Sequence, residues 1–284
     1  MYQVVIIGGG PAGVSAALYL ARANIKTAII ENGPGALARA HKIENFYGIA
    51  ASGLRLYAEG LEQAQKLGVD IIQDEVLAVE YFDSFVLTLK NQPKPLPAPV
   101  LLLATGTKNI TLNLPGLLEL EGKGISYCAV CDGFFFRQKQ VAVLGEGPFA
   151  LHEAEYLQHL AAKVTVLTHG KDDALAKAAG FATITTPLTS ISGEGKLETI
   201  HFADGSQLEV NGLFIALGTA DSTDMARKLG AQLDGRYIKV DEDCATNIPG
   251  LFAAGDCIGG LKQLSKAVYD GTRAGLAIIK YLRH

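Results

Sequence analysis

The sequence has few of the features that mark secreted, membrane or nucleic-acid-binding proteins. Its 284 residues include four cysteines, too few for a disulfide scaffold, so any bridge is expected to be catalytic. No apolar run approaches the ~20 residues needed to span a bilayer, and the first residues lack the basic segment of a secretory signal. The net charge is -4 without a long Lys/Arg block, which argues against nucleic-acid binding. We therefore expect a compact protein of the reducing cytoplasm.

A glycine-rich loop follows the first apolar segment. Residues 3–7 predict a short strand, residues 8–13 read Gly-Gly-Gly-Pro-Ala-Gly, and residues 12–23 predict an Ala-rich helix. The G-x-G-x-x-G spacing is carried by Gly8, Gly10 and Gly13. In this context the glycines permit a tight turn and let a pyrophosphate approach the backbone at a helix N-terminus. The loop therefore predicts a dinucleotide site.

Two residues near this loop strengthen the prediction. Pro11 suits the first turn of a helix, where its missing N–H costs no hydrogen bond. Glu31 follows the second predicted strand, Thr27 to Ile30, at the place where a carboxylate can hold the adenosine ribose hydroxyls. An acid there excludes a nucleotide with a 2′-phosphate.

Two cysteines three residues apart form a candidate redox pair. Cys128 and Cys131 lie on one side of a helical turn, close enough to open and close as a disulfide, and Asp132 follows the second. Zinc is the alternative for such spacing, but it needs two further ligands. Cys244 and Cys257 are single, far apart and without a His at ligand spacing, so we expect them in the core. The pair predicts a two-electron relay and no metal site.

A second β-α-β pattern follows the cysteine pair. Residues 140–144 predict a strand, residues 148–161 a helix and residues 163–168 another strand. The loop between the first two reads Gly-Glu-Gly-Pro-Phe-Ala, and its candidate ligand-binding residues are Gly145, Gly147, Pro148 and Ala150. Two dinucleotide folds in one chain are typical of an enzyme that uses a flavin and a nicotinamide.

The remaining segments predict an α/β protein with two Rossmann-like, three-layer ββα domains, the second inserted into the first. A buried strand at 100–103 ends in Ala104-Thr105-Gly106, and another at 251–254 ends in Gly255-Asp256. An amphipathic helix is predicted from Ser265 to Leu282, a loop from Gly33 to Gly48, antiparallel strands at 69–79 and 85–89, and a linker from Lys108 to Gly124. We expect a split domain of residues 1–110 and 243–284 and an inserted domain of residues 111–242.

These segments together resemble the low-molecular-weight thioredoxin reductases along nearly the whole chain. The resemblance rests on residues 8–13, Ile43-Glu44-Asn45-Phe46, residues 104–106, residues 126–135 and residues 250–256. It implies that FAD lies in the split domain, that the dithiol lies in the inserted domain and that the protein is a homodimer. The implied FAD-binding residues are Gly8, Gly10, Pro11, Ala12, Gly13, Glu31, Asn45, Ala104, Thr105, Gly106, Gly255, Asp256, Gln263 and Leu264.

The resemblance also implies a role for each residue of the dithiol segment. Cys131 faces the flavin C4a atom, Cys128 exchanges with the thiol of a partner, and Asp132 is the acid and base. The implied partner is a thioredoxin-like or other dithiol protein, reached through a mixed disulfide. The resulting hypothesis is a flavoprotein disulfide oxidoreductase.

The second nucleotide loop departs from the pattern of NADPH-dependent members. Those members carry a His-Arg-Arg run whose arginines neutralise the 2′-phosphate. Here residues 168–173 read Thr-His-Gly-Lys-Asp-Asp, and Glu146 adds a negative charge inside the loop. Losing charge-assisted hydrogen bonds, each worth about 1.5 to 3 kcal/mol, predicts poor NADPH binding. NADH is not favoured either, because neither Thr168 nor His169 is a carboxylate.

Three explanations of the altered second loop remain open. Pro148 stands at the loop position that Pro11 holds in the first fold, so a second FAD is the preferred occupant. Direct electron exchange with a ferredoxin-type carrier is another, and the basic residues of the C-terminal tail could attract it: Lys262, Lys266, Arg273, Lys280 and Arg283. Weak use of NADPH is the third. A flavin redox sensor without turnover is the non-enzymatic alternative.

Overall fold

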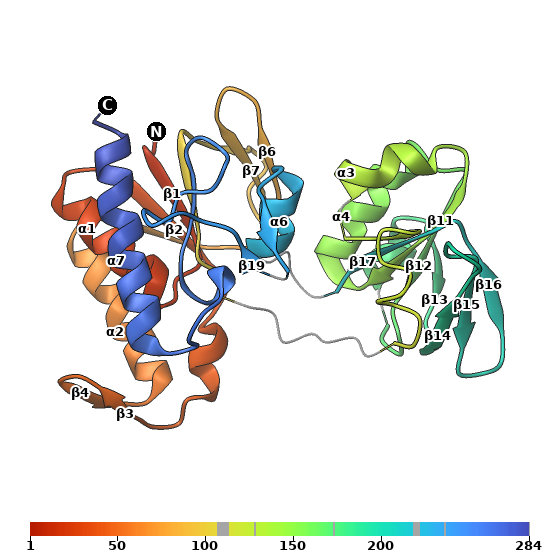
Figure 1. The fold of residues 1–284 in the computed structure, drawn as a ribbon, viewed down its shortest axis with the longest axis horizontal. Helices are drawn as coiled ribbons and strands as arrows, with labels where there is room; N and C mark the ends of the chain where they lie inside the picture. Colours follow the sequence, from red (N-terminus) through yellow and green to blue (C-terminus); the bar gives the residue numbers. More distant parts are fainter. Residues whose placement is uncertain (107–113, 128, 173, 218–221, 236, 284) are drawn as a thin grey trace. The chain divides into compact units, whose positions relative to one another are not determined.

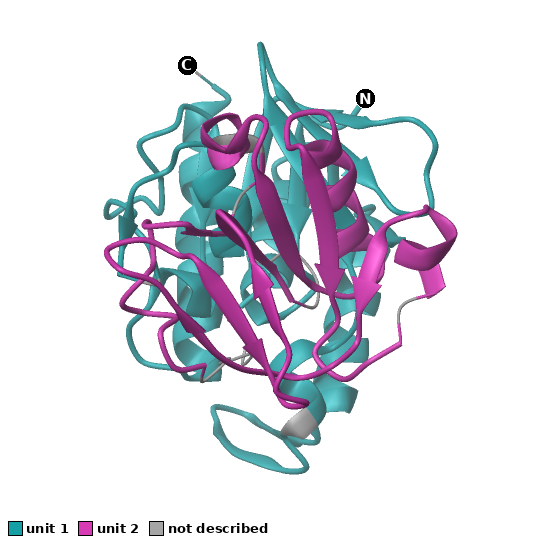
Figure 2. Ribbon diagram, turned by 90° about the vertical axis from the view of Figure 1, so that its right-hand side faces the viewer, with its two compact units in different colours: residues 1–108, 221–284 teal, residues 109–220 magenta. Residues whose placement is uncertain are grey.

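The computed structural model describes residues 1–106, 114–127, 129–172, 174–217, 222–235 and 237–283. The chain divides into two compact units, Met1–Lys108 with Asp221–His284 and Asn109–Ala220, which Figure 2 colours separately. Among the described helices, none is long and apolar enough to cross a membrane.

A parallel five-stranded sheet is the centre of the first unit, with strand order β20-β9-β1-β2-β5. Its strands are β1 (Val4–Ile7), β2 (Thr27–Glu31), β5 (Asp70–Gln73), β9 (Val100–Leu103) and β20 (Leu251–Ala253). Every residue of β1, β2 and β9 is buried, as expected for apolar strands covered on both faces. Figure 1 shows α1 (Pro11–Arg22), α2 (Gly53–Lys66) and α7 (Leu264–Tyr281) beside this sheet.

Shorter elements complete the first unit. An antiparallel sheet contains β6 (Val76–Tyr81), β7 (Phe85–Leu89) and β8 (Leu96–Ala98). The others are η1 (Gly35–Arg39), β3 (Ile43–Phe46), β4 (Ile49–Ala51), α6 (Ser222–Lys228), β18 (Leu233–Asp234), β19 (Tyr237–Ile238) and η3 (Gly255–Ile258).

The second unit repeats the same plan. Its parallel sheet has the order β10-β17-β11-β12-β13. These strands are β10 (Ile125–Ser126), β11 (Gln140–Gly145), β12 (Lys163–Leu167), β13 (Ala182–Ile184) and β17 (Gly212–Ala216). An antiparallel sheet is built from β14 (Leu188–Ser192), β15 (Thr199–Phe202) and β16 (Gln207–Glu209). The helices are α3 (Ala129–Asp132), η2 (Gly133–Phe136), α4 (Gly147–Gln158) and α5 (Ala174–Ala178).

Both parallel sheets reverse their strand order beside their first long strand. In the first unit the reversal lies between β1 and β9, and in the second it lies between β11 and β17. Ligands of such sheets bind at the carboxyl ends of the strands at this switch point. The predicted α/β class with two Rossmann-like sheets is therefore confirmed, and each glycine loop follows a strand at the switch point.

The predicted boundaries of the two parts differ from the observed units. The chain returns to the first unit at Asp221 rather than at residue 243, because α6 packs against β6 and β19 against η3.

The predicted linker from Lys108 to Gly124 is wrong for its described part, residues 114–124. Leu114, Leu117 and Leu120 are buried in the core of the second unit. Residues 108–113 of that prediction lie outside the described residues.

Two local predictions in the first unit were also wrong. The predicted strand at 69–79 divides into β5, which joins the parallel sheet, and β6, which pairs antiparallel with β7. The chain turns between them at Asp74, whose carboxylate accepts hydrogen bonds from the backbone N–H groups of Glu75 and Asn91. The predicted loop from Gly33 to Gly48 contains η1 and β3.

Helices α1 and α7 pack with their backbones in direct contact. A Cβ placed on Gly271 would lie 2.0 Å from the carbonyl oxygen of Ala12, and one on Gly275 would lie 2.9 Å from that of Ala16. Figure 1 shows the two helices side by side. Helix α7 has glycine at these two positions because its backbone lies so close to that of α1 that no side chain fits between them.

Replacing Gly271 by Ala is expected to lower the free energy of unfolding by about 1 to 3 kcal/mol, the usual cost of overpacking. Gly60→Ala in α2 is the matched control, because its Cβ would lie 3.5 Å from Cγ1 of Val14 in α1, an ordinary contact. That variant should be neutral or gain up to about 1 kcal/mol of helix propensity. Denaturant unfolding of both variants measures the difference, and equal stabilities would contradict the packing.

Cys244 and Cys257 are fully buried free cysteines, as the sequence predicts. The Cys257 thiol lies 3.2 Å from the carbonyl oxygen of Ala254, and the Cys244 thiol lies 3.7 Å from that of Asp270. Burial raises the pKa of Cys244 to about 11 from an ordinary value of 9.0. Both side chains therefore act as small core residues.

The raised pKa of Cys244 predicts a loss of stability in alkali. The folded protein holds the proton of the Cys244 thiol more tightly than the unfolded chain does. The contribution of this thiol to the free energy of unfolding is therefore complete below pH 9.0 and disappears as the pH rises to about 11. Across that window the wild-type protein should lose more free energy of unfolding than Cys244→Ala. Denaturant unfolding at several pH values tests this, and parallel pH dependences would be the contrary result.

Candidate active site

The first glycine loop is shaped by contacts that only glycine permits. Gly8 has a φ of +118°, and a Cβ there would lie 2.3 Å from the carbonyl oxygen of Ala104. A Cβ on Gly13 would lie 1.9 Å from the carbonyl oxygen of Gly8. The Ala104 N–H in turn donates to Ile7 O at 2.8 Å. The loop after β1 is thus packed directly against the end of β9.

The start of α1 is open on the side away from these contacts. Gly10 is the N-cap residue, and no atom of the described residues lies within 4 Å of the position that its Cβ would take. Pro11 and Ala12 begin the helix, whose first N–H groups have no intrahelical partner. Gly255, with a φ of +84°, approaches Ala12 so closely that its Cβ would lie 2.9 Å from Ala12 Cβ. A pyrophosphate fits this glycine cradle.

Glu31 occupies the end of β2 with a defined orientation. Its side chain is buried, and its Oε2 atom accepts a hydrogen bond from Gly33 N at 2.8 Å and another from the Tyr57 hydroxyl. Burial raises the pKa of Tyr57, and the hydrogen bond to Glu31 raises it further. Among the described residues both of these donors go to Oε2, so Oε1 can accept a hydrogen bond from a ribose hydroxyl. Sequence reasoning missed Tyr57, which reaches Glu31 from α2.

The turn after β9 is fixed by a residue from the returning segment of the chain. Thr105 N donates to Ser222 Oγ at 3.0 Å, and Ser222 N donates to Thr105 Oγ1 at 2.8 Å. Ser222 is fully buried, and Gly106 adopts a φ of +74° beyond the pair. No sequence signal identified Ser222, because its contact with Thr105 depends entirely on the tertiary fold.

The remaining predicted residues of this site lie on β3, in η3 and at the start of α7. Asn45 on β3 donates its side-chain amide to Gln263 Oε1 at 3.2 Å. Gln263 is the N-cap of α7 and Leu264 its first residue. Asp256 lies in η3 and is half-buried. The structure therefore brings residues from both ends of the chain to one unit, and their geometry fits a dinucleotide such as FAD.

The dithiol segment lies in the second unit. Cys128 is outside the described residues, and Cys131 lies within the short helix α3. Asp132 Oδ2 accepts a hydrogen bond from Ser126 Oγ at 2.6 Å. The first N–H of α3, on Ala129, donates to Glu153 Oε2 at 2.8 Å, and Glu153 is only 2% exposed. A buried carboxylate on α4 thus anchors this helix, a contact that the sequence analysis missed.

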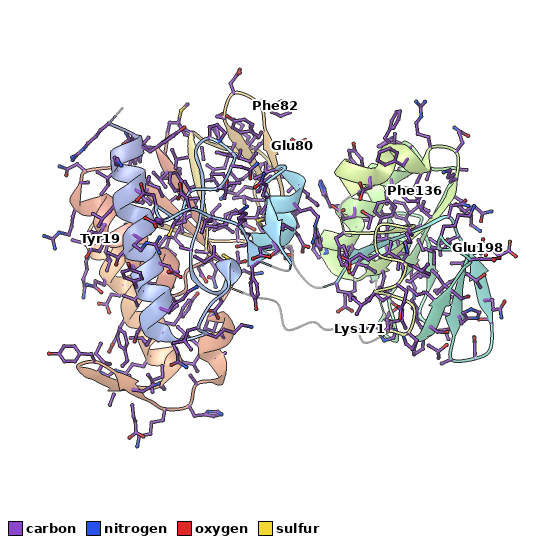
Figure 3. The ribbon with its side chains drawn as sticks, in the orientation of Figure 1. Tyr19, Glu80, Phe82, Phe136, Lys171 and Glu198 are labelled. Atoms are coloured by element: carbon purple, nitrogen blue, oxygen red, sulfur yellow. The ribbon has the colours of Figure 1, made fainter. Side chains whose placement is uncertain are left out.

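The second glycine loop has the backbone of a nucleotide fold but carries an internal ion pair. A Cβ on Gly145 would lie 2.1 Å from Ala216 O, and Gly147 has a φ of +72°. Pro148 and Ala150 lie in the first turn of α4. Glu146 is the N-cap residue of that helix, and its carboxylate forms an ion pair with the ammonium of Lys171, which Figure 3 labels. The loop at the start of α4 therefore carries a negative side chain that is paired with a lysine of the same unit.

The predicted basic face of α7 is smaller than the sequence suggested. Lys266 is turned inward, with its ammonium 2.7 Å from Asp270 Oδ2 and its side chain 19% exposed. Lys280 lies 3.7 Å from Asp243 Oδ2, and Arg273 donates to the carbonyl oxygen of Glu242. The prediction of an open basic surface is therefore wrong for Lys266, because a buried acid one turn away draws it into the fold.

Comparison with known proteins agrees with this arrangement. A family model described as pyridine nucleotide-disulphide oxidoreductase matches residues 2–271. A thioredoxin reductase of Listeria monocytogenes is 35% identical over 303 residues, covering 99% of this chain and 94% of the relative. One from Peptoclostridium acidaminophilum is 33% identical over 307 residues, covering 99% and 97%.

Two solved structures are similar over the whole chain. The atypical thioredoxin reductase TRi from Desulfovibrio vulgaris Hildenborough has a TM-score of 0.93 at 38% identity, covering 100% of this chain and 98% of that one. A ferredoxin-flavin thioredoxin reductase from Clostridium acetobutylicum has a TM-score of 0.74 at 29% identity, covering 99% and 98%. The chain belongs to the pyridine nucleotide-disulphide oxidoreductase family, and within it is a low-molecular-weight, thioredoxin reductase-like flavoprotein disulfide oxidoreductase.

Proposed function

We propose that the protein exchanges electron pairs with a thioredoxin-like partner through Cys128 and Cys131, uses FAD in its first unit, and does not take electrons from NADPH. Bound FAD supplies a ring that accepts or donates two electrons. The chain supplies the thiols: reduction of the Cys128–Cys131 disulfide takes up two electrons and two protons, and oxidation releases them. The observation that carries the donor assignment is the Glu146–Lys171 ion pair at the second nucleotide loop.

The groups around the dithiol support this chemistry. Ser126 holds the Asp132 carboxylate one residue beyond Cys131, where it can give and take the proton of a thiol. Glu153 fixes the start of α3 from a buried position. Cys128 is the sulfur that attacks or is attacked by the partner, and Cys131 resolves the mixed disulfide.

An exposed aromatic pair next to the dithiol supports a protein partner. Phe134 and Phe135 follow Cys131 on η2 and are 64% and 68% exposed, with ring centroids 6.3 Å apart. The guanidinium of Arg137 lies 5.6 Å from the Phe134 ring. Exposed aromatic and arginine side chains are the usual anchors of protein interfaces. A thioredoxin-like protein docks here with its own disulfide against Cys128.

The ion pair at the second loop argues against NADPH. The α4 N-terminus would attract a nucleotide phosphate, but Glu146 is its N-cap residue and Lys171 is already engaged with that carboxylate. Lys171 is followed by acidic Asp172, and residues 168–172, the described part of this segment, contain no arginine that could clamp a 2′-phosphate. The names of two similar structures, atypical thioredoxin reductase and ferredoxin-flavin thioredoxin reductase, are in line with another electron source.

A second FAD is the proposed occupant of this loop. Pro148 begins α4 as Pro11 begins α1, and FAD carries no 2′-phosphate that would require an arginine clamp. A ferredoxin-type carrier is the alternative donor, and it needs only one flavin per chain. The proposed setting is the reducing cytoplasm, where the dithiol is kept available, and the proposed assembly is a homodimer.

Flavin content and the response to NADPH test the donor assignment together. Denaturing the purified protein should release close to two FAD per chain, and anaerobic NADPH should not bleach the flavin within seconds. One FAD per chain with rapid bleaching by a reduced ferredoxin would move the donor to the protein carrier. Rapid bleaching by NADPH would overturn the donor assignment.

The two cysteines should behave differently when each is replaced by serine. Cys131→Ser leaves Cys128 as a single thiol, and the test partner is a thioredoxin-like protein without its resolving cysteine, whose remaining thiol is first converted to a mixed disulfide with thionitrobenzoate. Attack by the Cys128 thiolate on the partner's sulfur releases thionitrobenzoate and leaves a protein–protein disulfide, which is visible on non-reducing gels. Cys128→Ser should retain FAD yet form no adduct. An adduct with Cys128→Ser alone would reverse the two roles, and none with either variant would favour the redox sensor.

A further inference from the structure

Lys266 lies inside the fold beside the turn that carries Asp256. Its ammonium group lies 2.9 Å from Gly255 O, in close contact with Gly259 O, and 2.7 Å from Asp270 Oδ2. Two of the three N–H donors of the ammonium go to the carbonyl oxygens of Gly255 and Gly259. The contact with Asp270 is an ion pair rather than a directed hydrogen bond. The lysine therefore joins both ends of η3 to α7.

The turn that Lys266 holds is rich in glycine. Gly255, Gly259 and Gly260 have φ values of +84°, +79° and +79°, in the left-handed region that glycine favours. Glycine loses more conformational freedom on folding than any other residue, so a turn with three such glycines needs an external constraint. A backbone hydrogen bond from Gly259 N to Asp256 O at 3.1 Å closes the turn but does not attach it to the helix. The ammonium provides that attachment.

The position of Lys266 is electrostatically unfavourable for the helix alone. It lies in the first turn of α7, where the helix dipole is positive and a cation is disfavoured. Asp270, one turn further along, has a side chain only 4% exposed and compensates the charge. A buried ion pair is weak evidence for added stability, because desolvation offsets much of the attraction. The arrangement is better explained by the two carbonyl oxygens that the ammonium holds.

We infer that Lys266 is a positioning residue, an internal cation that holds the turn from Gly255 to Gly260 in the shape in which Asp256 meets FAD. The inference rests on the proposed FAD site. Lys266 acts through Asp256 and does not itself contact the cofactor. Removing the ammonium frees the two glycine carbonyl groups, so the turn samples other shapes and Asp256 is no longer presented in one place.

The test is a double-mutant cycle on FAD affinity, measured by titrating apoprotein with FAD and following flavin fluorescence. Lys266→Met, which keeps the length of the side chain without its charge, should weaken FAD binding at least tenfold. Lys280→Met is the matched control from the exposed end of the same helix and should stay within twofold of wild type. In an Asp256→Ala background, Lys266→Met should have less than a twofold further effect.

A loss of global stability is separated from positioning by a second variant. Lys266→Met with Asp270→Leu replaces the buried ion pair by apolar side chains, which restores a folded protein if the single variant does not fold. This double variant should still bind FAD at least tenfold more weakly than wild type. Wild-type affinity in the double variant, or a full tenfold effect of Lys266→Met on top of Asp256→Ala, would overturn the inference. If wild-type apoprotein binds no FAD, the proposed function fails instead.

Discussion

Direct backbone contact around the start of α1 is the constraint on which the first unit depends. Side chains on Gly8, Gly13 and Gly255 would overlap Ala104 O, Gly8 O and Ala12 Cβ, at 2.3, 1.9 and 2.9 Å. These contacts bring the loop after β1, the end of β9 and the turn after β20 together. A site for a dinucleotide therefore follows from the packing itself, at the switch point of the sheet.

Polar contacts between distant segments then give this backbone its functional detail. Ser222 fixes Thr105, Tyr57 orients Glu31, and Lys266 holds the turn around Asp256. In the second unit Glu153 plays a comparable part for the dithiol helix. The second unit has the same close backbone contact, with Gly145 against Ala216 O, but its glycine loop carries the negative side chain of Glu146. Two similar folds thus differ in the charge of their glycine loops.

The parts that could be predicted from the sequence are those whose physical cause is local. Both glycine loops follow β-branched strands and precede helices, and the predicted C-terminal helix differs from α7 by one residue at each end. The dithiol spacing is likewise local.

Contacts between distant residues could not be predicted: Ser222 and Thr105 are 117 positions apart, and Tyr57 and Glu31 are 26 apart. The i,i+4 spacing of Lys266 and Asp270 is visible in the sequence, but the contacts of Lys266 with the carbonyl oxygens of Gly255 and Gly259 could not be predicted from it. The segment that contains Leu114, Leu117 and Leu120 was predicted to be a linker, because three apolar residues at this spacing are too few to indicate burial.

The central claim is that electron pairs pass between a flavin in the first unit and the Cys128–Cys131 pair in the second. Anaerobic addition of a small dithiol to the oxidised holoenzyme tests it most directly, with flavin absorbance as the readout. The account predicts that the wild-type flavin bleaches and that the flavins of Cys128→Ser and Cys131→Ser bleach far more slowly, although both variants retain FAD. Equal bleaching in all three proteins would contradict it, because the flavin would then be reduced without the cysteine pair.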